Sequence, residues 1–217
     1  MAFLNEQTNE LHIKILIAGG TGCGKTTNLQ SLYKQTSSEI NSRLFDLHDL
    51  SQRSYFYEFL PMSLGESKAH SLRLNVYTLP SHNIWESVLL NLAWGIDGLV
   101  FVVDSRISAL EQNEKQRERL RSLLRCVGKS WDDIPLVFQF NRRDAADALP
   151  IKALKSEFSR ESAAAIEGVA VQDIGVLETI DAISDRILSQ MDVPTFNTSF
   201  AALQSGPGKT DTRRPVQ

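Results

Sequence analysis

The stretch IKILIAGGTGCGKTT, residues 13–27, decides the expected fold of this 217-residue chain. The apolar run 13–18 indicates a buried strand, and the glycine-rich turn after it, residues 19–26, fits the pattern GxxxxGK[ST]. Glycines let several backbone amides turn inward around an anion, and a helix that begins directly after the turn adds its positive end. The stretch therefore predicts a phosphate-binding loop.

Two side chains of the loop have predicted functions. Lys25 places an ammonium beside the β and γ phosphates of a nucleotide, where it also serves catalysis, and the hydroxyl of Thr26 is a ligand for Mg²⁺. The predicted nucleotide-binding residues of the loop are Gly19, Gly20, Thr21, Gly22, Cys23, Gly24, Lys25, Thr26 and Thr27.

Composition narrows the class of protein. The net charge is −3 with acidic and basic residues intermixed, so the sequence indicates no nucleic-acid partner. Two cysteines form neither a disulfide framework nor a paired metal motif, which favours a reducing cytoplasm. No apolar run approaches the roughly 18 residues of a membrane span, and no signal, myristoylation or prenylation pattern is present. We therefore expect a cytoplasmic protein with no membrane anchor.

Hydrophobic periodicity predicts the rest of the fold. Strand-like segments cover 71–79, 98–103 and 135–140, and helical patterns lie between them, which predicts an α/β fold with a mostly parallel sheet covered by helices on both faces. A last amphipathic helix is expected from about Gly175 to Met191. We assign residues 1–192 to one domain and expect residues 193–217 to form a disordered tail, because periodicity is lost there.

A second motif predicts which base is bound. Asn141 to Asp144 form an NxxD element directly after the strand 135–140, where ligands of open α/β sheets bind. The carboxylate of Asp144 suits the N1–H and exocyclic amine of guanine, a donor pair that adenine lacks. Val169 and Ala170 are expected to end a short strand before the last helix. The predicted nucleotide contacts outside the loop are Ser81, Asn141, Arg143, Asp144, Val169 and Ala170.

The phosphate loop together with NxxD resembles the Ras-like small GTPases, a class of P-loop NTPase, over roughly residues 10–191. Within that superfamily the chain looks most similar to the MglA group of bacterial GTPases, which control cell polarity and gliding or twitching motility. The resemblance rests on GCGKTTNLQ (22–30), RSYFYEFLPMSLGE (53–66), YTLP (77–80), GLVFVVDS (98–105) and NRRD (141–144).

The resemblance implies functions for residues that spacing alone does not identify. Arg53 matches the built-in arginine of the MglA group, which enters the active site from the first switch loop and supplies charge to the transition state. Ser54 matches a switch hydroxyl that binds Mg²⁺ beside Thr26. Thr78 stands where most small GTPases have Asp, and the MglA group shares this threonine.

Two positions of the second switch loop depart from the group. Its members have TxPGQ where this chain has Thr78, Leu79, Pro80, Ser81 and His82. If the backbone there needs a glycine-only angle, Ser81 costs roughly 1–3 kcal/mol. A histidine that positions water poorly in place of glutamine costs on the order of 3–4 kcal/mol in the transition state.

Three functions remain open from the sequence. The first is a small guanine-nucleotide switch that hydrolyses GTP slowly to GDP with Mg²⁺, with Arg53, Lys25 and His82 as catalytic residues. By resemblance its partners are a roadblock-type homodimer of the MglB kind, which would activate it, and polarity or motility effectors, and the protein is expected to be recruited to a cell pole. The second is a hydrolysis-impaired nucleotide-binding scaffold. The third is an adenine-nucleotide enzyme, against which Asn141 and Asp144 argue.

Overall fold

The computed structural model describes residues 2–5, 7–36, 45–46, 58–66, 71–80, 86–158 and 163–191. In chain order its elements are β1 (Phe3–Asn5), β2 (Glu10–Gly19), α1 (Lys25–Thr36), β3 (Phe45–Asp46), β4 (Glu58–Glu66), β5 (Ser71–Thr78), α2 (Glu86–Ala93), β6 (Gly98–Asp104), η1 (Ile107–Ala109), α3 (Leu110–Cys126), β7 (Leu136–Asn141), α4 (Ile151–Phe158), β8 (Ala164–Glu167), η2 (Ala170–Gln172) and α5 (Val176–Gln190).

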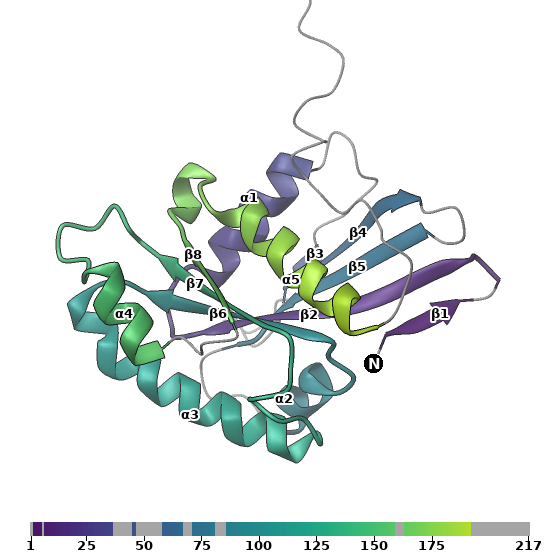
Figure 1. Cartoon of the computed structure of the whole chain (residues 1–217), viewed down its shortest axis with the longest axis horizontal. Helices are drawn as coiled ribbons and strands as arrows, with labels where there is room; N and C mark the ends of the chain where they lie inside the picture. The colour runs from purple at the N-terminus through teal and green to yellow at the C-terminus, as the bar shows by residue number, and fades with distance from the viewer. Residues whose placement is uncertain are drawn as a thin grey trace, which may run out of the picture.

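The described strands form one sheet in the order β3-β4-β5-β2-β6-β7-β8, and β1 pairs with β2. The central strands β5, β2, β6, β7 and β8 run parallel, while β3, β4 and β1 join through antiparallel pairings. Helices α1 and α5 cover one face of this sheet, and α2, α3 and α4 cover the other (Figure 1). The arrangement confirms the predicted α/β fold with a mostly parallel sheet between two helical layers.

The side chains divide the core between the two faces. In the first half of β2 and throughout β5 buried residues alternate with partly exposed ones, and the buried apolar residues on the α1 and α5 side include Ile13, Ile15 and Leu74. In β6 and β7 every residue is buried, as expected of strands covered on both faces. These two continuous apolar runs therefore fix the centre of the sheet.

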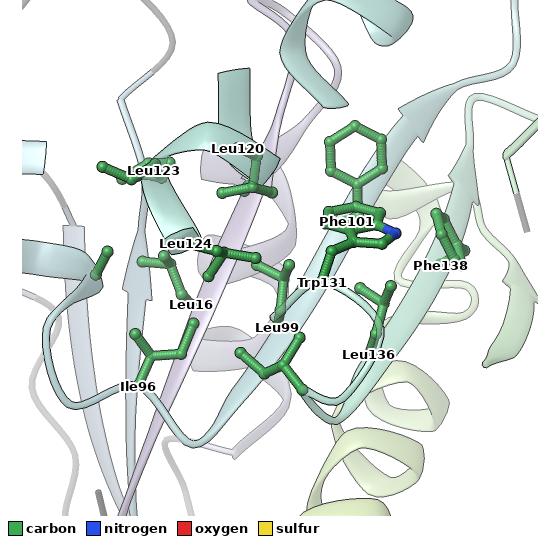
Figure 2. Close-up of a cluster of buried hydrophobic side chains, with 14 of the residues drawn as sticks. Leu16, Ile96, Leu99, Phe101, Leu120, Leu123, Leu124, Trp131, Leu136 and Phe138 are labelled. Carbon is green, nitrogen blue, oxygen red and sulfur yellow. The ribbon is translucent and has the colours of Figure 1, made fainter. Parts of the chain in front are cut away.

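Aromatic rings organise the core beneath α3. Phe101, Trp131 and Phe138 contact one another edge to face, with ring centroids 5.9–6.2 Å apart. Leucines from β2, β6, β7 and α3 surround them (Figure 2). This cluster holds α3 against β6 and β7, whose carboxyl ends carry the candidate site.

The structure contains elements that the sequence did not predict. Strand β4 includes Pro61 and Gly65, which interrupt a strand pattern, and it pairs antiparallel with β5 at the outer part of the sheet. Strand β1 is three residues long and helix α4 eight, too short for a strong periodic signal. The strands and the last helix that were predicted with bounds end within one or two residues of the observed ones, but β2 begins three residues earlier than predicted, and the strand expected to end at Val169 and Ala170 ends at Glu167.

Two features of the described helices concern the predicted domain boundary and the possibility of a membrane-spanning helix. Helix α5 ends at Gln190, close to the predicted domain boundary, and the predicted tail 193–217 lies outside the described residues. Among the helices that the structure describes, none is both long and apolar enough to cross a membrane.

Candidate functional site

The predicted phosphate loop connects β2 to α1 at the edge of the sheet where the parallel strands end. Strand β2 lies between β5 and β6, so the chain leaves β2 toward one side of the sheet and continues through β6 on the other. Ligands of open α/β sheets bind outside the strand ends at such a reversal. The fold therefore places the loop where a ligand is expected.

The ammonium of Lys25 lies inside the curve of the loop. Its Nζ donates hydrogen bonds to the carbonyl oxygens of Gly19 at 3.1 Å and Gly20 at 2.8 Å. Lys25 is also the first residue of α1, whose N-terminal amides favour negative charge. One ammonium and one helix end thus converge on the same small space.

Cys23 takes part in the loop through its backbone. The side chain is 1% exposed, and burial raises the pKa of its thiol, so it is neutral and unreactive. Its carbonyl oxygen accepts a hydrogen bond from Nδ2 of Asn141 at 2.8 Å. Thr21 is exposed, and Thr27 is half-buried on the first turn of α1.

At position 24 both the backbone conformation and a neighbouring side chain disfavour any residue other than glycine. Its φ is +105°, and a Cβ placed on it would contact the side-chain nitrogen of Asn141. The NxxD segment therefore packs directly against the backbone of the phosphate loop.

Asn141 joins three segments that are distant in the sequence. While Nδ2 contacts the phosphate loop, Oδ1 accepts a hydrogen bond from the backbone nitrogen of Ala170 at 3.0 Å. Val169 and Ala170 do not end a strand as predicted, because β8 ends at Glu167 and Ala170 begins the short helix η2. The predicted neighbours are thus brought together, but through a turn that Asn141 holds.

Asp144 and Arg143, the other two predicted site residues of the NxxD element, differ in their contacts. Asp144 is exposed on the turn after β7. The guanidinium of Arg143 instead donates to the carboxylate of Glu167 at 2.9 Å and to the carbonyl of Leu149 at 2.7 Å. Arg143 therefore braces this turn, and its side chain is engaged by protein groups.

Sequence reasoning missed Arg142, although it lies inside the NxxD element. Its φ is +62°, and its Nη2 donates to the carbonyl oxygen of Gly22 in the phosphate loop at 2.7 Å. Its Nε lies 3.3 Å from Oδ2 of Asp104, at the end of β6. The only sequence signal was a second basic residue between Asn141 and Asp144.

Two buried amides behind the loop were also missed. Gln139 of β7 is fully buried and donates to Oδ1 of Asn28 at 2.7 Å, and Nδ2 of Asn28 donates to the carbonyl of Gly24 at 2.9 Å. The first bond fixes the start of α1 relative to β7, and the second ties Asn28 to the loop that precedes the helix. The signal was a single polar residue within the apolar run LVFQF.

Of the two predicted Mg²⁺ ligands, Thr26 lies within the described residues and Ser54 does not. Thr26 is the second residue of α1 and has an exposed hydroxyl, an oxygen donor of the kind that Mg²⁺ binds. Over the described ranges no group of three or more His, Cys, Asp or Glu side chains forms a metal site. One or two protein oxygens and substrate phosphates commonly hold Mg²⁺ together, and the assignment of Thr26 as such a ligand stays a prediction.

Four predicted site residues belong to segments that the structure does not describe. Arg53, Ser54, Ser81 and His82 all lie outside the described residues. The first predicted switch loop, residues 37–57, precedes β4, and the second, residues 80–86, follows β5.

Comparison with known proteins gives one extensive match. No protein-family model matches the chain. The chain is 34% identical over 191 residues to the mutual gliding-motility protein MglA of Myxococcus xanthus (strain DK1622), and the match covers 88% of this chain and 98% of that protein.

Proposed function

Because this chain belongs to the MglA family of Ras-like small GTPases, we propose that it is a guanine-nucleotide switch that binds GDP and GTP and hydrolyses GTP slowly. The observation that supports this best is the pair of hydrogen bonds made by Asn141, one to the phosphate loop and one to Ala170. Through this side chain the segments proposed to hold the phosphates and the base form one unit.

The loop supplies most of the proposed phosphate binding. Inward-facing amides of residues 19–24 and the Lys25 ammonium bind the diphosphate, and Thr26 with Ser54 holds Mg²⁺ against it. When bound, Mg²⁺ neutralises part of the charge on the β and γ phosphates.

Asp144 is proposed to select guanine. Its carboxylate accepts from two donors of that base, and replacing it with asparagine offers a donor instead. We expect Asp144→Asn to weaken GDP binding by about 1.5–3 kcal/mol, roughly 10- to 150-fold, because charge-assisted hydrogen bonds are lost. The variant should gain affinity for xanthosine diphosphate, which has an oxygen where guanine has its amine.

Calorimetric titration of the full chain with GDP, ADP and xanthosine diphosphate measures this selectivity. Asp132→Asn, which alters an exposed aspartate on the α3–β7 connection, is the matched control and should leave GDP affinity unchanged. Tighter binding of ADP than of GDP by the wild-type chain would contradict the proposal.

For hydrolysis we propose that Arg53 stabilises the charge of the transition state and that His82 orients the attacking water. Single-turnover measurements with GTP should then show a loss of at least about a hundredfold in Arg53→Ala, since an arginine at this position contributes strongly. Arg125→Ala, an exposed arginine of α3, is the control.

Ser81 and His82 favour a second candidate, a nucleotide-bound scaffold with impaired hydrolysis. It predicts barely detectable turnover that Arg53→Ala leaves unchanged. A large gain in His82→Gln would instead show that the catalytic machinery is present and that this substitution reduces its rate.

We further propose that the switch acts in cell polarity or motility from the cytoplasm, at a cell pole. The relative's name connects that protein with gliding motility. A roadblock-type homodimer of the MglB kind is the proposed activating partner, and adding one to the single-turnover assay should accelerate GTP hydrolysis.

A further inference from the structure

We propose that Arg106 and Arg142 compete for the carboxylate of Asp104, and that this competition sets how fast nucleotide leaves the phosphate loop. The inference rests on the proposed function, because it concerns the same nucleotide site. It assigns Asp104 and Arg106 as positioning residues that act through Arg142.

Asp104 lies at the carboxyl end of β6 with only 3% of its surface exposed. A buried carboxylate needs compensating donors, since an unpaired charge in the interior is costly. Two guanidinium groups approach it, from Arg106 on the following turn and from Arg142 after β7.

Arg106 makes the better-aligned contacts. Its Nη2 donates to Oδ2 of Asp104 at 2.7 Å and its Nε to Oδ1 at 3.0 Å, a two-pronged arrangement. The backbone nitrogen of Arg106 also donates to Oδ1 at 3.1 Å. The carboxylate is therefore oriented toward Arg106.

Arg142 is left with an ion pair but without a hydrogen bond at its Nε. This atom lies 3.3 Å from Oδ2 of Asp104, yet it is buried and has no hydrogen-bond partner among the described residues. Oδ2 of Asp104 is thus shared between Arg106, which donates to it, and Arg142, whose buried Nε lies beside it, and this sharing points to a second geometry in which Asp104 turns toward Arg142.

The competition reaches the nucleotide through Gly22. Nη2 of Arg142 donates to the Gly22 carbonyl in the phosphate loop at 2.7 Å. When Asp104 holds Arg142 firmly, this contact keeps the loop in one shape, and a preorganised loop loses less entropy on binding. Arg106 weakens that hold by occupying the carboxylate.

Release of a fluorescent GDP from the full-length protein, chased with excess GDP, tests the competition. Arg106→Gln should slow release about threefold, the change that one partly exposed ion pair supports. Arg142→Ala should accelerate it by a similar factor. In Arg142→Ala, adding Arg106→Gln should change nothing, because the group that transmits the effect is gone.

Two further variants separate this role from simple loss of stability. Arg106→Lys keeps the charge without the two-pronged contact and should fall between wild type and Arg106→Gln. Arg125→Gln, an exposed arginine of α3, should release GDP at the wild-type rate. Thermal unfolding of each variant accompanies the kinetics, and the order of release rates should not follow the order of stability.

The outcomes distinguish the two proposals. If wild type fails to bind the fluorescent GDP, the proposed function is wrong and this inference falls with it. If wild type binds it but Arg106→Gln accelerates release, leaves it unchanged, or has the same effect with and without Arg142, only the competition is overturned.

Discussion

Gly24 shows how a single residue without a side chain joins two motifs. It needs a positive φ, and it also leaves space for the side chain of Asn141. Gly22 has a positive φ of +71° as well, but a Cβ there would meet no atom of the described residues within 4 Å. A substitution at Gly22 therefore tests backbone strain alone, whereas one at Gly24 tests backbone strain together with steric contact against Asn141.

We predict that Gly24→Ala weakens GDP binding more than Gly22→Ala. Each alanine costs about 1–2 kcal/mol for its left-handed backbone. Only Gly24→Ala also displaces Asn141, and the bonds from Asn141 to Cys23 and Ala170 would be lost with it. Calorimetric titration with GDP measures both variants, and equal losses would show that packing against Asn141 contributes nothing.

At the scale of elements, β7 connects the base segment to α1 and α5. Its residue Gln139 donates from Nε2 to Asn28 on α1, and to the Gly175 carbonyl and Thr179 Oγ1 at the start of α5. One buried amide thus holds two helices against the strand that ends in the NxxD turn.

We predict that Gln139→Leu lowers the free energy of unfolding by about 1–3 kcal/mol, because buried polar partners lose their donor. Chemical denaturation gives the value. Gln190→Leu, at the exposed end of α5, should stay within about 0.5 kcal/mol of wild type. A stability of Gln139→Leu equal to wild type would mean that the amide network is energetically neutral.

The same elements show what the sequence can predict. The apolar runs of β6 and β7 and the glycine pattern after β2 are local signals, and they correctly located these strands and the turn between β2 and α1. The bonds from Asn141 to Cys23 and from Arg142 to Gly22 join residues far apart in the chain. No local pattern encodes them, because they depend on which strand ends become neighbours in the sheet.

At the scale of the whole molecule, Lys14 connects three parts of the fold. It lies on β2 above the ring of Tyr77 in β5, and its Nζ donates to the carbonyl of Trp94 before β6 at 2.8 Å. It is half-buried, and burial lowers the pKa of its ammonium below the usual 10.5, against a smaller opposing effect of Asp97.

This shift predicts a pH dependence of stability. Between the lowered pKa and 10.5, the unfolded chain binds a proton at Lys14 that the folded chain does not. The free energy of unfolding contributed by Lys14 should therefore rise with pH across this window and level off above it. The difference between wild type and Lys14→Met, measured by denaturation at a series of pH values, isolates the effect. A difference that falls with rising pH would contradict it.

Strand β2 is enclosed along both edges. Strand β5 pairs with it on one side over residues 10–17, while β1 and β6 divide the other side, and Asp97 bonds to the backbone of Lys14 between them. We therefore expect the backbone amides of β2 to become accessible to solvent only when the whole domain unfolds. Because β2 is held on both sides, we expect it to stay rigid and the loop that follows it to change shape through the turns after β6 and β7, which contact that loop through Arg142 and Asn141.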